Sequence, residues 1–120
     1  MDWKLEHHRP IWTQLTEQLK RRIIAGVYPP GSKLPPVREL AAEAGVNPNT
    51  MQRALAQLEQ DGLARADRTA GRLVTQDAEA LEAVRTAQAR VIVQRYLNEM
   101  AELGYSREEA GLLPQKEETI

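Results

Sequence analysis

The chain has 120 residues, contains no cysteine and no phenylalanine, and carries a net charge of −1 at pH 7. This length fits one small domain with an appendage, and the absence of cysteine excludes a disulfide framework and a thiolate metal site. The charge is uneven: residues 1–75 hold 11 Lys/Arg against 8 Asp/Glu, a net charge of +3, and residues 76–120 hold 5 against 9, a net charge of −4. We therefore expect only the first part to contact a polyanion such as nucleic acid.

The first nine residues predict a polar arm rather than a binding site. Trp3 and Leu5 are the apolar residues after Met1, and we expect Trp3 to pack on the body of the protein. The adjacent His7 and His8 would point in different directions, and no carboxylate or cysteine cluster completes a site around them. We therefore predict no metal site.

A long helix is predicted from Pro10 to about residue 25, because proline is favoured at the first helical position and apolar residues then recur at helical spacing. Near its C-terminal end, Lys20, Arg21 and Arg22 could contact DNA, but the helix dipole and solvent are the simpler account of these cations. The expected buried stripe comprises Ile11 or Trp12, Leu15, Leu19 and Ile23.

Two short amphipathic helices separated by a tight turn follow. The first has apolar residues at helical spacing from Val37 to Ala44 and ends at Gly45, which can adopt the left-handed conformation of a helix C-terminus. The second begins at about Pro48, after the helix-capping side chain of Asn47. This arrangement is typical of a helix-turn-helix.

The second of these helices has one apolar face and one polar face. Its outward residues are Asn49, Gln52, Arg53 and Ala56. Asn and Gln can pair with adenine and Arg with guanine in the major groove, and alanine permits close approach. The alternative is an ordinary solvated face, but the preceding helix and glycine turn favour DNA recognition.

A β-hairpin is predicted next, with strands over residues 63–66 and 72–75. Its tip offers Arg68, Gly71 and Arg72, and a glycine allows the backbone to approach a phosphate or the minor groove closely. A plain surface hairpin is the alternative. Its position after a helix-turn-helix favours a DNA-contacting wing.

A helix from Asp77 to about Leu103 is predicted to form the dimer interface, because its later part is apolar over too wide an arc for one neighbouring helix to cover. Ser106 and Glu109 then predict a capping box for a last short helix, and residues 114–120 predict a disordered polar tail. The predicted interface comprises Val84, Val91, Ile92, Tyr96, Leu97, Met100 and Leu103.

Several fixed spacings together resemble the GntR family of bacterial transcription regulators, and residues 47–50 followed by an Arg-Ala pair resemble its short YtrA-like branch. The resemblance spans residues 10–74. The matching residues are Leu34-Pro35-Pro36-Val37-Arg38-Glu39-Leu40-Ala41, Gly45-Val46-Asn47-Pro48-Asn49-Thr50, Arg53-Ala54-Leu55, Leu58 and Gly62-Leu63. The resemblance implies a mainly α fold with a small β wing, which is a winged helix-turn-helix followed by a short helical dimerisation segment. It also implies a proline-glycine bend and a short strand that includes Lys33 and Leu34.

The resemblance further implies a repressor that binds an inverted-repeat DNA operator as a homodimer. Two departures limit the transfer of base preference: Pro36 replaces a common capping serine, and Pro48 replaces a DNA-contacting arginine of other branches. Residues from the resemblance and from the hairpin together form the predicted DNA-binding set. It comprises Arg38, Asn47, Asn49, Thr50, Gln52, Arg53, Arg68, Gly71 and Arg72.

The predicted organisation is therefore a DNA-binding domain over residues 1–75, a dimerisation segment over 76–113 and a polar tail. The alternative function is a winged-helix module that binds protein. We predict no enzyme and no cofactor, because no phosphate-binding loop, activated nucleophile or metal spacing is visible. Any small-molecule effector would have to bind at the dimer interface. With no apolar stretch near the roughly 20 residues of a membrane span, we expect a cytoplasmic protein.

Overall fold

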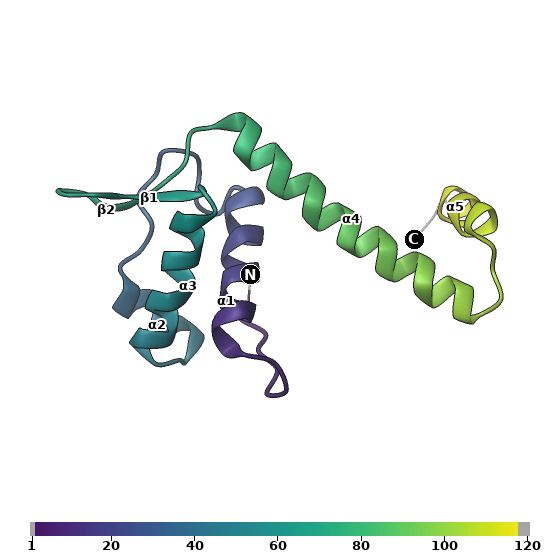
Figure 1. Ribbon diagram of the computed structural model, residues 1–120, viewed down its shortest axis with the longest axis horizontal. Helices are drawn as coiled ribbons and strands as arrows, with labels where there is room; N and C mark the ends of the chain where they lie inside the picture. The colour runs from purple at the N-terminus through teal and green to yellow at the C-terminus, as the bar shows by residue number, and fades with distance from the viewer. Residues whose placement is uncertain (1, 118–120) are drawn as a thin grey trace. The chain divides into compact units, whose positions relative to one another are not determined.

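The computed structural model describes residues 2–117 and contains, within them, five helices and one two-stranded antiparallel sheet (Figure 1). The chain divides into two compact units, Met1–Val84 and Arg85–Ile120. The expected fold class is confirmed: the protein is mainly helical, with a small β hairpin after a helix-turn-helix and a helical C-terminal segment. The elements in chain order are α1 (Ile11–Ile24), α2 (Val37–Ala44), α3 (Pro48–Gln60), β1 (Ala64–Asp67), β2 (Gly71–Val74), α4 (Ala78–Glu102) and α5 (Arg107–Lys116).

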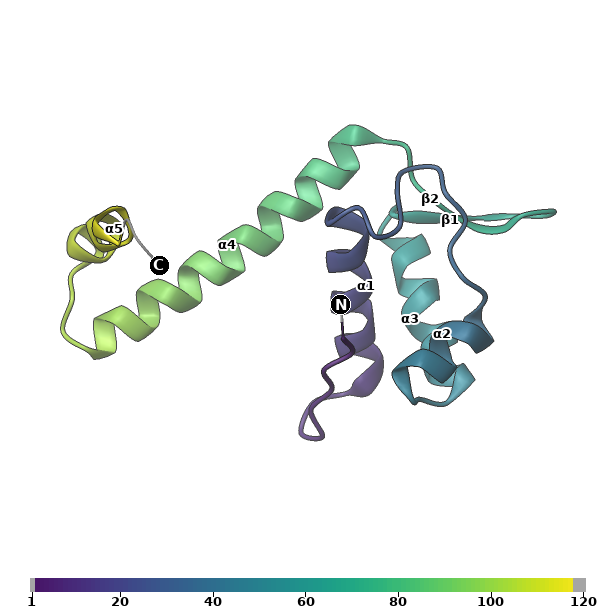
Figure 2. The same ribbon diagram turned by 180° about the vertical axis from the view of Figure 1, so that it is seen from behind.

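The core of the first unit is aliphatic, and it lies where α1, α2 and α3 pack together. Helices α1 and α3 lie side by side in both views (Figures 1 and 2). The buried stripe of α1 consists of Leu15, Leu19 and Ile23, while Trp12 is only half-buried. The buried face of α3 consists of Met51, Ala54, Leu55 and Leu58, each fully excluded from solvent. Burial of these side chains is the main stabilising contribution to the unit.

The turn between α2 and α3 has the geometry that the sequence predicts. Gly45 ends α2 with a φ of 70°, in the left-handed region that favours glycine. The N–H of Val46 then donates to the carbonyl of Ala41 at 3.0 Å, which pairs one of the terminal carbonyls of the helix. Two residues later α3 begins at Pro48, and its direction is therefore set within a few residues of the end of α2.

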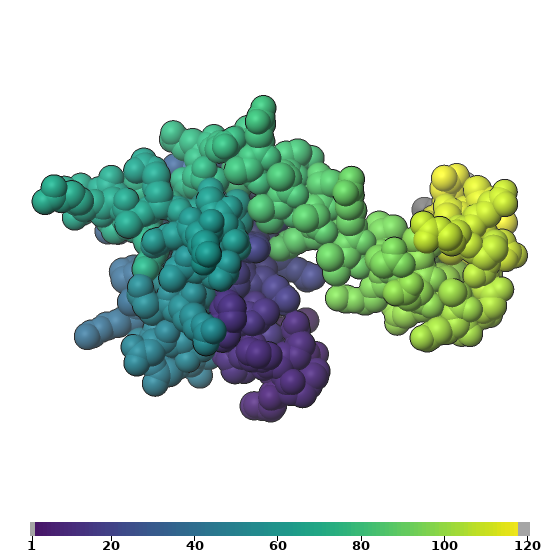
Figure 3. All heavy atoms as spheres, in the orientation of Figure 1, coloured from purple at the N-terminus to yellow at the C-terminus, as the bar shows by residue number. Residues whose placement is uncertain are grey.

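The hairpin of β1 and β2, which we call the wing, projects from the helical body of the first unit (Figure 3). Its strands start and end one residue away from the predicted positions. Leu63 is excluded from β1 because its N–H donates to the carbonyl of Leu58 at 3.0 Å and so completes the C-terminal turn of α3. At the other end, Gly71 joins β2 because it pairs with Asp67 across the hairpin.

A third extended segment pairs with β2, as the family resemblance implies. Lys33 forms an isolated antiparallel bridge with Leu73. On either side of it, the N–H of Leu34 donates to the carbonyl of Arg72 at 2.9 Å, and the N–H of Val74 donates to the carbonyl of Ser32 at 2.8 Å. These hydrogen bonds attach the wing to the segment that leads into α2.

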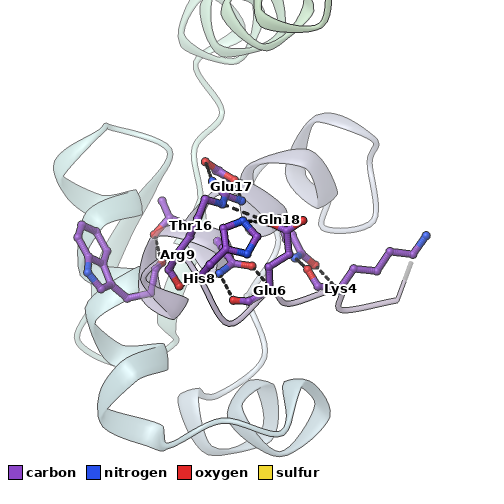
Figure 4. Close-up of polar contacts among 9 residues, drawn as sticks. Lys4, Glu6, His8, Arg9, Thr16, Glu17 and Gln18 are labelled. Atoms are coloured by element: carbon purple, nitrogen blue, oxygen red, sulfur yellow. Dashed lines mark hydrogen bonds and ion pairs between the residues drawn. The ribbon is translucent and has the colours of Figure 1, made fainter. Parts of the chain in front are cut away.

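The N-terminal arm lies along α1, where glutamine side chains form hydrogen bonds with its backbone N–H and carbonyl groups (Figure 4). Gln14 is 1 % exposed, and its amide accepts from the N–H of Glu6 and donates to the carbonyl of Glu6, both at 2.7 Å. One turn further on, Gln18 donates to the carbonyl of Lys4 at 2.6 Å and accepts from its N–H at 3.2 Å. Because both backbone groups of Lys4 and of Glu6 are paired, the arm is held to α1 at two points.

One expectation for α1 is wrong. Arg22, which we assigned to solvent and the helix dipole, is 5 % exposed. Its guanidinium lies 3.9 Å from the centroid of the Trp3 ring and donates a long hydrogen bond of 3.4 Å to the Tyr28 hydroxyl. Helical periodicity did not reveal this burial, because the arm that covers Arg22 comes from outside the helix.

The second unit contains the later part of α4, together with α5. The Ser106 hydroxyl accepts from the N–H of Glu109, and the Glu109 carboxylate accepts from the N–H of Ser106, so the predicted capping box is confirmed. Hydrogen bonding from Ser106 to the carboxylate, mainly from its backbone N–H, lowers the pKa of Glu109. Met100 and Ala110 are the buried apolar residues of this unit among those described.

The expected polar tail is partly wrong, because α5 continues through Pro114 to Lys116. Proline lacks the N–H that would bond to the carbonyl four residues earlier, which leaves the carbonyl of Ala110 without its helical partner. The Tyr96 hydroxyl of α4 donates to that carbonyl at 2.8 Å. This contact satisfies the carbonyl that the proline leaves unpaired. Residues 118–120 of the predicted tail lie outside the described residues.

Candidate nucleic-acid interface

The exposed face of α3 presents the polar side chains that the sequence assigned to base recognition. Asn49, Gln52, Arg53 and Ala56 are all exposed, opposite the buried face of the helix. The side chains of Asn49 and Gln52 form no hydrogen bond with another described residue, so their amide donors and acceptors are available to a ligand. Thr50, also predicted in the site, is half-buried. The helix therefore offers amide and guanidinium groups on its exposed face, and a major groove admits an α-helix.

Asn47 has a structural role at the start of α3. Its side-chain oxygen accepts from the N–H of Asn49 at 2.7 Å, and Pro48 occupies the first turn. This cap uses the oxygen of the Asn47 amide and leaves its NH₂ group exposed as a donor. The first turn of α3 also carries the partial positive charge of a helix N-terminus, which favours an anion.

Arg38 lies in the first turn of α2, with its side chain exposed. It forms no hydrogen bond or ion pair with any other residue that the structure describes. An exposed guanidinium without an intramolecular partner can bind a phosphate or a guanine through two parallel N–H donors.

Arg53 differs from the other predicted contacts, because it lies against an aromatic ring. Its guanidinium carbon is 4.1 Å from the centroid of the Trp12 ring, which α1 contributes. The sequence pattern placed Arg53 on the outward face but did not identify this neighbour.

The wing carries the remaining predicted residues, and they differ in how free they are to contact a ligand. Arg68 is exposed in the turn between the strands, and Gly71 follows with a φ of 86°. Arg72 is instead paired, since its Nε donates to the carboxylate of Glu59 at the end of α3. This ion pair links the wing to α3 and leaves less of Arg72 free for a ligand.

Lys33 is a basic residue near the wing that the sequence did not assign to the site. Its side chain is exposed and runs beside Gly71, where an added Cβ would lie 3.6 Å from Lys33 Cε. The family resemblance placed Lys33 in a strand before α2. That placement could have identified Lys33 as a site residue, since a strand that pairs with β2 brings its residues beside the wing.

At the tip of the wing, the Asp67 carboxylate organises the turn by accepting three hydrogen bonds at 2.9 Å. The donors are the N–H of Ala70, the N–H of Thr69 and the Thr69 hydroxyl. These bonds favour the charged carboxylate, and they lower the pKa of Asp67 below its ordinary value of 3.8.

We expect the turn to lose stability only in acid. Because the pKa is lowered in the folded state, the stabilisation is present above pH 3.8 and is lost as the pH falls through the lower, folded value. The amide chemical shifts of Thr69 and Ala70, followed by NMR, should titrate with a midpoint below 3.8. In the control variant Asp67→Asn this titration should disappear. A midpoint at or above 3.8 would contradict the assignment.

Lys20 and Asp61 form a second ion pair, at 2.8 Å, between α1 and the end of α3. Partial burial acts to raise the pKa of Asp61, but hydrogen bonds from Lys20 and Gln57 outweigh it, so the pKa is lowered. Asp61 is therefore charged at neutral pH, and the pair helps to hold α3 against α1.

Two other kinds of site find no support in the described part of the chain. Among residues 2–117, no three His, Cys, Asp or Glu side chains are grouped in a way that could hold a metal ion. In the same residues, no helix has the length and apolar character needed to cross a membrane.

Comparison with known proteins identifies relatives of the whole chain and of its first unit. The family described as "Bacterial regulatory proteins, gntR family" matches residues 12–74. The HTH-type transcriptional regulator YhcF of Bacillus subtilis is 33% identical over 91% of this chain and 90% of its own length. The HTH-type transcriptional repressor YtrA of the same organism is 39% identical over 58% of this chain and 53% of its own length.

Solved structures show the same fold. A GntR family transcriptional regulator from Listeria monocytogenes superimposes with a TM-score of 0.84 at 32% identity, covering 93% of this chain and 98% of that one. AraR(DBD), whose structure was solved in complex with operator ORE1, superimposes with a TM-score of 0.53 at 26% identity and covers 62% of this chain and 94% of that one.

Proposed function

Because this chain belongs to the gntR family of bacterial regulatory proteins and is a DNA-binding transcription regulator, we propose that it represses transcription as a homodimer bound to an inverted-repeat operator. The observation that carries the proposal is the exposed face of α3, where the side chains of Asn49 and Gln52 have no hydrogen-bond partner among residues 2–117. A repressor of this kind needs only to bind and occupy its site, so the proposed role is binding without catalysis. Its DNA target places its action in the cytoplasm.

In the proposed complex, α3 enters the major groove as the recognition helix. Asn49 and Gln52 then meet base edges, while Arg38 binds at the start of α2. The wing, with Arg68 and Gly71, lies along the neighbouring backbone or minor groove, where its contacts fix the register of the protein on the duplex. The NH₂ group of Asn47 and the N-terminus of α3 add donors for a phosphate.

The dimer is proposed from the exposed apolar residues of α4. Val91, Ile92 and Val93 are 58%, 52% and 53% exposed, and Leu103, which directly follows the C-terminal end of the helix, is 73% exposed. Branched apolar side chains on consecutive positions of a solvent-exposed helix are costly unless another surface covers them. A second copy of α4 related by a two-fold axis provides such a surface. Two recognition helices related by the same axis require an inverted-repeat site.

The residues predicted for this interface do not all have the same environment. Val84 and its neighbour Leu81 pack against the core of the first unit, and Met100 is 9% exposed. Tyr96 and Leu97 are half-buried. The exposed residues Val91, Ile92 and Leu103 are therefore those on which the proposal mainly rests.

The proposal is tested by selecting bound sequences from a random DNA pool with the purified protein. The expected result is an enriched inverted repeat, with binding that weakens steeply as salt rises because bound phosphates release counterions. If no sequence is enriched and a protein partner binds with little dependence on salt, the alternative of a protein-binding winged helix would hold instead.

Arg38 provides a direct test of the DNA-binding surface. The variant Arg38→Ala is expected to weaken operator binding by about 1–3 kcal/mol, because it removes a charge-assisted contact made by an exposed side chain. Binding is measured by fluorescence anisotropy at two salt concentrations, and circular dichroism confirms that the fold is retained. Glu43→Ala, an exposed change in the same helix that removes a negative charge, is the control and should not weaken binding. Equal isotherms for Arg38→Ala and the wild type would remove Arg38 from the site.

A further inference from the structure

We propose that Trp12 is a positioning residue that holds the Arg53 guanidinium over its indole, so that Arg53 binds a DNA phosphate beside the recognition helix instead of reading a base. This inference rests on the proposed binding of operator DNA. It assigns to Trp12, a residue of α1, a role in DNA binding that helix periodicity does not reveal.

The first step is the geometry of the pair. Arg53 Cζ lies 4.1 Å from the centroid of the Trp12 ring, well within the roughly 6 Å over which a cation is attracted to an aromatic face. Trp12 is half-buried at the start of α1, while Arg53 is exposed on α3. The two helices lie side by side in both ribbon views (Figures 1 and 2). A ring on α1 thus lies under a long side chain of α3.

The second step concerns the hydrogen-bond donors of Arg53. Stacking uses the face of the guanidinium and leaves its five N–H groups at the edge. Arg53 forms no hydrogen bond or ion pair with another residue in the described range 2–117, so these donors are available. The guanidinium groups of two other arginines are less accessible to a ligand than that of Arg53. Arg72 donates to Glu59, and Arg22, which is also stacked on a tryptophan, is 5% exposed.

The third step concerns what the donors can reach. A base-reading side chain extends from the recognition helix into the groove, as Asn49 and Gln52 are free to do. The guanidinium of Arg53 instead lies against Trp12, on the neighbouring helix α1. Beside a helix in the major groove lies the sugar-phosphate backbone, which accepts hydrogen bonds without regard to sequence. The stacked position therefore favours a phosphate.

The fourth step is the energetic role of Trp12. A free arginine side chain loses rotamer freedom when it is ordered on a ligand, and a side chain that is already ordered loses less. The ring thus improves binding without contacting DNA. Removal of the ring should weaken the Arg53 contact only in part, and should have no effect on binding when Arg53 is absent.

The stack itself is tested first in the free, full-length protein. The Nε–H resonance of Arg53, observed by NMR, should show an upfield ring-current shift that Trp12→Leu removes and Trp12→Phe partly retains. The same resonance position in the wild type and in Trp12→Leu would show that the stack does not form, and would overturn the proposal.

DNA binding is then measured for the wild type, Trp12→Leu, Arg53→Ala and the double variant, with an operator obtained by selection and an unrelated duplex. Arg53→Ala should weaken binding to both duplexes by about the same factor, roughly tenfold, and should reduce the slope of log K against log salt by about 1. Trp12→Leu should weaken binding about threefold, should have no further effect in the Arg53→Ala background, and should be partly rescued by Trp12→Phe. The matched control is Trp3→Leu, which removes the other stacked tryptophan and should leave binding unchanged.

Three results would overturn the inference while leaving the proposed function intact. They are additive losses in the double variant, tighter binding by Trp12→Leu, and a loss on Arg53→Ala that is confined to the operator. If the wild type binds neither duplex, the proposed function fails and the inference falls with it, although the NMR shift would still report the stack.

Discussion

Replacing Ile92 with glutamate is expected to convert the proposed dimer into a monomer and to weaken binding to the inverted repeat on the order of 100-fold. Ile92 is 52% exposed in the single subunit, within the apolar stretch of α4 that we propose to pack across a two-fold axis. A charge at that position would lose its hydration in the interface. Without the dimer, the two recognition helices no longer bind as one unit, so each half-site is bound alone. Sedimentation velocity at micromolar concentration gives the assembly state, and anisotropy gives the affinity.

Gln94→Glu is the matched control, because it introduces the same side chain two residues further along α4 at a polar, exposed position. It should remain dimeric and bind the operator as the wild type does. A monomeric wild type with full affinity for the inverted repeat, or an Ile92→Glu variant that is still dimeric, would contradict the proposed interface.

The variant Leu55→Ala is expected to lower the free energy of unfolding of the first unit by about 2–5 kcal/mol. Leu55 is fully buried in the middle of α3, where it packs with residues of the core cluster such as Leu15 and Leu40. The truncation removes buried apolar surface and leaves a cavity that the surrounding helices can fill only in part. Urea denaturation followed by tryptophan fluorescence measures the effect, since both tryptophans of the chain lie in this unit.

Gln60→Ala provides the comparison, because it lies in the same helix with its side chain exposed. The free energy of unfolding of Gln60→Ala should remain within about 0.5 kcal/mol of the wild-type value. If Leu55→Ala lowered the free energy of unfolding no more than the control does, α3 would not be anchored through this residue. The packing that orients its DNA-facing side would then need a different explanation.

The capping and turn residues show why so much of the fold was predictable from the sequence. Gly45, Asn47 and the pair Ser106 and Glu109 act on groups within three or four residues of themselves, so their effect is encoded locally. The buried and exposed faces of α3 were predictable for the same reason, since helical periodicity follows from backbone geometry alone. The hairpin followed from its strand pattern, and the family resemblance added the strand at Lys33.

The predictions that failed depend on contacts between segments that are distant in the sequence. Arg22 is buried because the arm with Trp3 covers it. In the second unit, the helix α5 passes through Pro114, and the hydroxyl of Tyr96 on another helix satisfies the carbonyl that the proline leaves free. No local pattern reports either contact.

For the candidate site, too, the local sequence pattern predicted some features and only the tertiary structure revealed others. The sequence by itself determined which residue types face outward from α3 and the wing, because the spacing of apolar residues fixes which side of each element is buried. Only the tertiary structure decided their state: Arg53 is stacked on Trp12, Arg72 is paired with Glu59, and Arg38 is free of any partner among the described residues. The physical reason is that side-chain pairing depends on which elements lie side by side, and the packing of the whole core sets that arrangement.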